Sequence, residues 1–423
     1  MDKMNHAVIV GAGMAGLASA AALSPYFKKV TVLDKDQRDR NDDVFPAGVR
    51  KAVPQGAHIH ILLRAGLDRL ESILPGISSA LESRGAVRVS FGSDQQIYEY
   101  GGWMPNRDLG IHFLSQSRPL LENVVFDYVS KIDNVQISHR SPVERLNFAT
   151  DPKGGAPSVT LRDGSKIASD IVIDAAGNGA PFLSEVSKVL SGEVPVEKSS
   201  IDLFYATLHF KKKAEWQGCQ ENILVNPEPG VSHIGGSLIS IEGESWCVSL
   251  HGTNGIKPPK TIEEWMDMAK NLADQRIWQR ICGADTLGSL KVFKKAHSVF
   301  RRFDQVSGIP IGYFPVGDTI TSFNPIYGQG MTVALGHVLA LRDAFAKKSS
   351  DLGFVFKDYL ENAIDSSRPA WERAASFDKN NKLISAQEGR METLRKLTRA
   401  RHSKAESDSG FHLQLAKQVH MLL

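Results

Sequence analysis

The sequence predicts an α/β fold in which a parallel sheet covered by helices is interrupted by a mixed, mainly antiparallel sheet and followed by a helical region. Three observations support this prediction. The stretch from His6 to Asp34 has the order strand, glycine turn, helix and strand. Segments between residues 201 and 251 alternate apolar and polar side chains, as antiparallel strands do. The chain after about residue 351 is rich in charge and helical in its periodicity.

The first strand ends in a glycine-rich turn with the spacing GxGxxG, from Gly11 to Gly16. Gly11 permits a tight turn, Gly13 lets the backbone approach a pyrophosphate, and Gly16 lets the helix pack against the strand. Free N–H groups at the helix N-terminus favour phosphate there. Asp34 follows the second strand, where a carboxylate accepts hydrogen bonds from a ribose diol. The pattern therefore predicts a Rossmann-like, dinucleotide-binding domain.

The composition is that of a globular protein and excludes several function classes. The formal net charge is only +3, so no strong field for nucleic acid is expected. No apolar run approaches the roughly 20 residues that a transmembrane segment needs, and the first strand begins too early for a signal peptide. Cys219, Cys247 and Cys282 lack CxxC spacing, so we expect a reducing, cytoplasmic location without a zinc site or disulfide framework.

An amphipathic helix is predicted across Leu62 to Leu74, where leucines recur at helical spacing. It is entered through a basic loop that contains Arg50, and His58 and His60 lie at the end of that loop. Two histidines at i and i+2 do not share a helical face. We therefore expect packing or hydrogen-bonding roles for them rather than a metal pair.

A second helix is predicted to open at Ser117, Arg118 and Pro119, since proline suits the first helical turn. The helix dipole disfavours a cation at this end, so Arg118 calls for an anionic or polar partner. An ion pair with a local Glu or Asp is the simpler alternative. Short strands are expected at Val87–Phe91, Ile97–Tyr100, Ile111–Leu114, Val135–Ser138, Ser158–Leu161, Lys166–Ala168 and Asp170–Gly177.

The middle of the chain is predicted to form the second sheet, with one helix over residues 261–272. Thr261 and Glu264 have the spacing of a capping box at its start. The expected antiparallel strands are Ala206–Phe210, Ser237–Ile241 and Trp246–Leu250.

A second motif returns the chain to the first domain. A predicted strand, Ile311–Val316, runs into Gly317 and Asp318, and a glycine turn with Pro325 follows. A long helix is expected from Met331, and Pro369 is expected to kink or break the helical tail.

From about Met4 to Phe345 the chain resembles the flavoprotein monooxygenases of the para-hydroxybenzoate hydroxylase fold. In that family a late Gly-Asp motif binds the ribityl chain of FAD through its aspartate, which implies this role for Asp318. The resemblance places Gly328 to Gly330 against the isoalloxazine ring, where only glycine allows so close an approach. It also points the N-terminus of the next helix at the pyrimidine edge, where a helix dipole stabilises an anionic reduced flavin.

The resemblance implies further contacts to FAD. Arg118 matches a position that reaches the ribityl or phosphate region, and Val143 one whose backbone meets the adenine. Arg50 matches a loop that lines the flavin, and Asp34 and Lys35 match the ribose-binding end of the second strand. The predicted cofactor-binding residues are Gly11, Gly13, Ala15, Gly16, Asp34, Lys35, Arg50, Arg118, Val143, Asp318, Pro325, Gly328, Gly330 and Met331.

The same resemblance predicts a division into three regions. Residues 1–85, 105–200 and 290–345 are expected to form a discontinuous FAD-binding domain. Residues 86–104 and 201–289 are expected to form the substrate-binding sheet domain, and residues 346–423 the C-terminal helical region.

One turn departs from the family's pattern. Single-component aromatic hydroxylases carry a middle Asp-Gly motif linked to FAD and NAD(P)H, whereas the matching turn here has Ala176 before Gly177. It resembles the turn of flavin-dependent epoxidases, halogenases and prenyl reductases, several of which take electrons from a separate reductase. Whether NAD(P)H reduces the flavin directly or through a separate flavin reductase therefore stays open.

The implied function is monooxygenation, with closest likeness to bacterial tailoring monooxygenases and epoxidases. Reduced FAD would react with O2 to give a C4a-hydroperoxyflavin, which transfers one oxygen atom to a hydrophobic small molecule, such as a natural product. Epoxidation and hydroxylation both stay open. The alternatives are an FAD-dependent prenyl or alkene reductase and a non-catalytic flavoprotein, while a halogenase is disfavoured because the chain lacks a WxWxIP motif.

The sequence identifies no catalytic residue. His233 and His251 lie on predicted strands of the second sheet and are candidates for acid–base roles. Aromatic candidates for the pocket, each better explained as core, are Trp103, Phe204, Tyr205, Trp246, Phe314 and Phe323.

Overall fold

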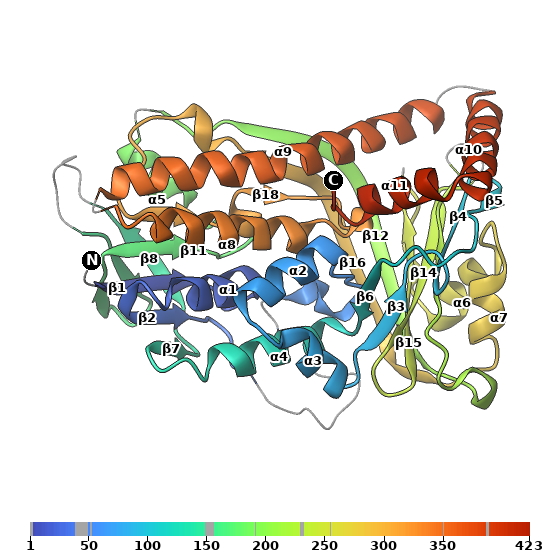
Figure 1. The fold of residues 1–423 in the computed structure, drawn as a ribbon, viewed down its shortest axis with the longest axis horizontal. Helices are drawn as coiled ribbons and strands as arrows, with labels where there is room; N and C mark the ends of the chain where they lie inside the picture. Colours follow the sequence, from blue (N-terminus) through green and yellow to red (C-terminus); the bar gives the residue numbers. More distant parts are fainter. Residues whose placement is uncertain are drawn as a thin grey trace.

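The computed structural model describes residues 3–38, 50, 53–148, 156–190, 192–228, 232–253, 255–349, 351–385 and 389–423. Figure 1 shows two main parts along the long axis of the molecule, a parallel sheet flanked by helices and a larger mixed sheet. Long strands run between the two parts, and the C-terminal helices lie across both. The predicted α/β architecture is confirmed.

The parallel sheet is the core of the nucleotide-binding part. Its central strand is apolar on both faces, and Ala7, Val8 and Ile9 have no exposed surface, as expected for a parallel sheet covered on both sides. Helix α1 (Met14–Leu23) is almost entirely buried, because its alanines let it pack closely between the sheet and α8 (Gly330–Ala346). In spatial order the strands are β17 (Tyr313–Pro315), β11 (Ile171–Asp174), β1 (Met4–Val10), β2 (Phe27–Leu33) and β7 (Val135–Ser138).

The mixed sheet has eight strands among the described residues, and its two longest strands pair antiparallel over sixteen residues each. The predicted antiparallel strands are confirmed as the middle of this sheet. In spatial order the strands are β18 (Thr321–Ser322), β16 (Thr286–Arg301), β12 (Val196–Lys211), β15 (Ser245–Gly252), β14 (Ile234–Ile241), β13 (Asn222–Val225), β4 (Gln95–Glu99) and β5 (Gly102–Trp103).

The two faces of this sheet differ in chemistry. On β12, Ala206, Leu208 and Phe210 join an apolar core with helices α6 (Ile262–Lys270) and α7 (Arg276–Ile281). The alternate residues point the other way, because successive side chains of a strand face opposite sides. We call these residues of β12 and β15 the polar face: Tyr205, Thr207, His209, Cys247, Ser249 and His251.

Shorter elements complete the fold. The described residues include a two-stranded ladder of β3 (Val87–Ser90) and β6 (His112–Ser115) and a three-stranded sheet of β8 (Val143–Asn147), β9 (Ser158–Leu161) and β10 (Lys166–Ala168). Further helices are α2 (Arg64–Ile73), α3 (Ile77–Ser83), α4 (Arg118–Val129) and α5 (Leu183–Val189), with short turns η1 (Pro54–Ala57), η2 (Ala214–Trp216), η3 (Phe303–Gln305), η4 (Gly317–Thr319) and η5 (Pro325–Tyr327). The C-terminal helices are α9 (Leu352–Ser385), α10 (Arg390–Ser407) and α11 (Ser409–Val419).

Helix signals in the sequence are confirmed at two starts. The Ser117 hydroxyl accepts a hydrogen bond from the Leu120 amide as the N-cap of α4, and Thr261 accepts one from Glu264 at 3.2 Å as the N-cap of α6. Pro369, in contrast, does not end the tail helix, because α9 continues through it. Packing explains this continuation, since the neighbouring Trp371 is buried and α9 lies along α8.

The C-terminal helices contact the segments that follow strands β13 and β3. Arg395 of α10 pairs with Glu228 at 2.6 Å, and His420 after α11 stacks edge-on against Phe91 with ring centroids 4.9 Å apart. Among the described residues no helix combines the length and apolarity needed to cross a membrane. The predicted boundaries of the three regions stay predictions.

Candidate cofactor and substrate site

The glycine turn between β1 and α1 has two packed glycines and one open one. A Cβ on Gly16 would lie 1.8 Å from the carbonyl oxygen of Gly11, and one on Gly11 would lie 2.5 Å from the carbonyl oxygen of Ala175. Gly11 also has a φ of +103°, which L side chains rarely adopt. A Cβ on Gly13 would meet nothing within 4 Å. Gly11 and Gly16 therefore shape the turn, while Gly13 leaves open space at the N-terminus of α1.

The second motif packs directly on the first. A Cβ on Gly317, whose φ is +65°, would lie 3.0 Å from the Cβ of Ala15 in α1. The Gly317 amide donates to His337 Nδ1 of α8 at 3.0 Å, which fixes the turn against that helix. Helix α8 begins at Gly330, one residue before the predicted start, and a Cβ on Gly330 would meet nothing within 4 Å. Two motifs far apart in the sequence thus form one surface.

Asp318 lies half-buried among three cationic side chains. Burial raises the pKa of its carboxyl group, and the charges of Lys295, Arg118 and Arg301 act in the opposite direction. Among the described residues the carboxylate accepts no hydrogen bond, although Arg301 donates to the Asp318 backbone carbonyl at 3.1 Å. An acceptor in such a place suits a ligand rich in hydroxyl groups.

A buried cluster of arginines surrounds Glu122 of α4. Arg118 Nε donates to Glu122 Oε1 at 2.8 Å, Arg50 Nη1 lies 3.2 Å from Oε2, and Arg38 Nη2 lies 3.7 Å from Oε2. Burial alone would raise the pKa of Glu122, but the three arginines lower it. Arg50 also donates to the carbonyl of Ala12 in the glycine turn at 3.0 Å. The simpler alternative expected for Arg118, an ion pair with a local acid, is therefore present: its partner Glu122 lies one helical turn further along α4.

The end of β2 joins this cluster. The Asp34 carboxylate forms an ion pair with the Arg50 guanidinium, and its Oδ1 accepts from the Asp36 amide at 3.1 Å. Its backbone carbonyl accepts from the Ser141 amide at 2.8 Å, which brings the start of β8 at Val143 beside the carboxyl end of β2. Lys35, in contrast, is exposed.

The loop after Asp318 is held by the C-terminal region. Asn324 Nδ2 donates to Asp378 Oδ1 of α9 at 2.8 Å, and the Tyr327 hydroxyl donates to the same oxygen at 2.9 Å. Gly328 follows with a φ of +64°. Met331, at the start of α8, contacts the Arg118 guanidinium through its sulfur. The structure thus gathers the predicted cofactor residues, apart from Lys35, around one region, and their role in binding stays a prediction.

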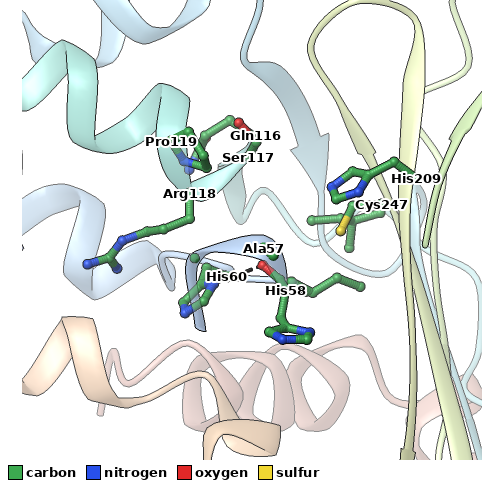
Figure 2. Close-up of a pocket in the computed structure, with 12 residues that line it drawn as sticks. Ala57, His58, His60, Gln116, Ser117, Arg118, Pro119, His209 and Cys247 are labelled. Atoms are coloured by element: carbon green, nitrogen blue, oxygen red, sulfur yellow. Dashed lines mark hydrogen bonds between the residues drawn. The ribbon is translucent and has the colours of Figure 1, made fainter. Parts of the chain in front are cut away.

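Two adjoining cavities lie between this region and the polar face. The first is lined by Arg50, Glu122 and their neighbours, and the second reaches the polar face. Gly56, Arg118 and Pro119 line both. Figure 2 shows the second cavity, whose lining residues are Gly56, Ala57, His58, Ile59, His60, Gln116, Ser117, Arg118, Pro119, His209, Ile239 and Cys247.

Histidines dominate the polar lining of the second cavity. Burial lowers the pKa of His58 and His209 to about 4 and that of His60 to about 3, so all three imidazoles are neutral near pH 7. His58 Nδ1 lies 2.7 Å from the Thr207 hydroxyl, which in turn contacts the Ser249 hydroxyl. His60 Nδ1 lies 2.9 Å from the His58 carbonyl. The hydrogen-bonding role expected for His58 and His60 is confirmed.

The earlier pocket candidates have different places. Four of the aromatic candidates are core residues, with exposures of 4% or less: Phe204, Trp246, Phe314 and Phe323. Trp103 lines neither cavity, and its indole N–H donates to Asp274 at 2.9 Å. Tyr205 and His251 do belong to the polar face, where they face each other across β12 and β15, whereas His233 precedes β14.

Sequence reasoning missed three residues that line the second cavity: Gln116, His209 and Cys247. His209 carried a usable signal, because it alternates with the apolar residues of β12. Burial raises the pKa of the Cys247 thiol, which therefore stays protonated.

Asp174, in the turn that departs from the family's pattern, has a structural role. Its carboxylate is fully buried and accepts hydrogen bonds from the Tyr313 hydroxyl at 2.9 Å and the Ala176 amide at 3.1 Å. Burial raises its pKa, and these bonds oppose that. The residue ties β11 to β17 below the Gly317 turn.

Comparison with known proteins supports this architecture. A family model described as an NAD(P)-binding Rossmann-like domain matches residues 9–39, which contain the glycine turn and Asp34. Protein Rv3254 of Mycobacterium tuberculosis is 27% identical to this chain over 394 residues, which cover 89% of this chain and 81% of that protein.

Two examples of similar solved structures cover more than nine-tenths of this chain. HpxO of Klebsiella pneumoniae, complexed with FAD and uric acid, has a TM-score of 0.68 at 15% identity, covering 99% of this chain and 97% of that chain. PqsL from Pseudomonas aeruginosa, a probable FAD-dependent monooxygenase, has a TM-score of 0.62 at 16% identity, covering 91% of this chain and 97% of that chain. The predicted resemblance is confirmed at the level of the fold: this chain has the fold of the FAD-dependent monooxygenases related to para-hydroxybenzoate hydroxylase.

Proposed function

We propose that this protein is an FAD-dependent monooxygenase that inserts one oxygen atom of O2 into a hydrophobic small molecule, such as a natural product, by epoxidation or hydroxylation. The observation that supports it most is the packing of Gly317 against Ala15, which joins the Gly-Asp motif to the glycine turn. Likeness to proteins described as FAD-bound or as a probable FAD-dependent monooxygenase favours the same conclusion.

The residues present fit FAD. Gly13 and Gly330 each leave open space at the N-terminus of a helix, where N–H groups and the helix dipole favour anionic groups. Arg50 and Arg118 would hold the pyrophosphate and ribityl region, and Asp318 would accept hydrogen bonds from ribityl hydroxyls. Asp34 would accept hydrogen bonds from the ribose once Arg50 turns to the phosphates.

When bound, FAD would carry two electrons to O2, so that one oxygen atom enters the substrate and the other leaves as water. The chain's own task is to bind the substrate next to this chemistry and to exclude water. The second cavity suits that task, because it opens beside Arg118 and is lined by buried side chains. No residue of the chain is assigned as a catalytic acid or base.

The electrons would come from NAD(P)H, either directly or through a separate flavin reductase. Ala176 stands where single-component hydroxylases carry an acid, which favours the second route. Anaerobic mixing of the FAD-loaded protein with NADH or NADPH distinguishes them, because only direct reduction bleaches the flavin without a partner.

The proposal is tested by supplying isotope-labelled O2 to the chemically reduced, FAD-loaded protein with a panel that contains styrene and para-cresol. A monooxygenase transfers the label to an organic product. Label recovered only in hydrogen peroxide across the panel would contradict the proposal and favour a non-catalytic flavoprotein. Saturation of the alkene without stoichiometric O2 consumption would favour the reductase alternative.

A further inference from the structure

The second cavity has a mainly apolar lining surface and a single charged side chain. Arg118 is the one charged side chain among its twelve lining residues, and its guanidinium is already paired with Glu122 at 2.8 Å. The three histidines are neutral near pH 7, as shown above, and Cys247 keeps its proton. Apolar surface comes from Ile59 and Ile239. Such a lining has nothing to balance a carboxylate or ammonium group, and burying an unbalanced charge is strongly unfavourable.

Gln116 is unlike the other polar residues of this cavity. Its side chain is 1% exposed, and among the described residues its Oε1 has no hydrogen-bond partner. The adjacent Ser117 is fully satisfied by comparison, since its amide donates to Glu242 at 2.9 Å and its hydroxyl contacts the same carboxylate. A buried carbonyl without a partner costs about 1–3 kcal/mol. A ligand that donates a hydrogen bond would remove that cost.

The position of Gln116 matches a role in substrate recognition. It directly precedes the N-cap of α4, the helix that carries Arg118 and Glu122. In the view of Figure 2 it lies across the cavity from His58 and His60, with His209 and Cys247 on a third side. A molecule held here would lie between the polar face and the region assigned to FAD.

We propose that this cavity is the substrate pocket and that Gln116 selects a neutral substrate with an O–H or N–H donor, such as an alcohol, a phenol or an amide. The inference rests on the proposed function, because it takes the cavity beside the FAD region to be the place of reaction. It narrows the substrate class, which the fold leaves open.

The test compares three probes of similar shape: para-cresol, which has the donor; para-methylanisole, in which a methyl group replaces its proton; and para-toluate, which is charged. Binding to the FAD-loaded protein is measured by calorimetry at pH 7. The variant Gln116→Met removes the amide at similar volume, and Gln116→Asn withdraws it by one methylene, so one informative variant remains if the other does not fold. Gln279→Met, on the exposed side of α7, is the matched control.

We expect the wild-type protein and the Gln279→Met control to bind para-cresol about threefold to tenfold tighter than para-methylanisole, as one hydrogen bond provides. Para-toluate should bind most weakly. Both Gln116 variants should lose the preference for para-cresol while keeping the affinity for para-methylanisole.

Equal affinity of the wild-type protein for the two neutral probes, a preference that survives in the Gln116 variants, tightest binding of para-toluate, or no binding of any probe would each overturn the inference. Calorimetry does not depend on the flavin, and FAD loading is measured first by its visible absorbance. Failure to load FAD therefore counts against the proposed function and is separate from failure to discriminate the probes.

Discussion

The nucleotide end of the molecule and the polar face of the mixed sheet are built in different ways. At the nucleotide end, short contiguous motifs shape the backbone, and the key residues are glycines. The lack of a side chain permits close backbone packing at Gly11 and Gly16 and leaves open space at Gly13. The polar face is assembled from alternate residues of β12 and β15, completed by a loop with His58 and by Gln116. A backbone-built site is specified locally, whereas a site built from side chains on several elements exists only once the sheet has formed.

The strongest test of this difference is a pair of substitutions in one turn. Gly16→Ala places a Cβ on the Gly11 carbonyl, so we expect a loss of about 3 kcal/mol or more, or no folded protein. Gly13→Ala meets open space, and its φ of −81° suits alanine, so stability should change by less than about 1 kcal/mol. Urea denaturation measures both. Equal losses in the two variants would contradict the distinction between packed and open glycines.

The arginine cluster sharpens the comparison, because the nucleotide end also contains buried charge. Glu122→Gln leaves Arg118, Arg50 and Arg38 without their shared carboxylate and should cost about 3–5 kcal/mol. Asp127→Asn is the control on the same helix: it removes a partly exposed pair with Arg84 and should cost under about 1 kcal/mol. Similar denaturation midpoints for the two variants would show that the three arginines do not depend on Glu122 as their shared carboxylate.

Neighbouring residues on β12 compare the two faces of the sheet. Leu208→Ala opens the fully buried apolar face and should cost about 2–5 kcal/mol. Thr207→Val keeps the volume of the polar face but removes hydrogen bonds to His58 and Ser249, at about 1–2 kcal/mol. If chemical denaturation showed Thr207→Val to be less stable than Leu208→Ala, the polar face would contribute more to stability than the apolar face, contrary to this account.

The two histidines of the polar face and the adjacent His58 should also make stability depend on pH. The pKa of His58, His209 and His251 is about 4 in the folded protein and 6.5 when unfolded, so between these values the unfolded chain binds more protons. Each histidine therefore contributes stability that is complete above pH 6.5 and is lost as pH falls toward 4, at about 1.4 kcal/mol per pH unit. Denaturation midpoints between these pH values measure the slope.

The matched variant for that slope is His251→Gln, which removes one titrating group. In this variant the free energy of unfolding should fall less steeply as pH falls from 6.5 to 4, because one fewer proton is taken up on unfolding. An unchanged slope would mean that His251 is already accessible to protons in the folded state.

Much of the nucleotide end could be predicted from the sequence, because its signals are local. The glycine spacing, the Gly-Asp motif, the Ser117 cap and the start of α8 each depend on a few adjacent residues, and the structure places them within one residue of expectation. The ion pair between Asp34 and Arg50 was not foreseen, although both residues were singled out, because a loop brings them together.

The polar face could not be predicted to the same depth. The pairing of Tyr205 with His251 depends on strand order and register, which no local pattern fixes. Gln116 carries no motif, and its importance comes from a hydrogen bond that it lacks. The break allowed for at Pro369 does not occur for a related reason, since packing of α9 along α8 outweighs the local preference of proline.

The most direct test of the account is a titration of the purified protein with FAD, repeated with Gly13→Ala and Asp318→Ala. We expect one FAD per chain, and affinity at least tenfold weaker in both variants. For Gly13→Ala the stability should be nearly unchanged, because a Cβ there meets nothing within 4 Å. Absence of FAD binding to the wild-type protein, or equal affinity in all three proteins, would contradict the assignment of this surface as the cofactor site.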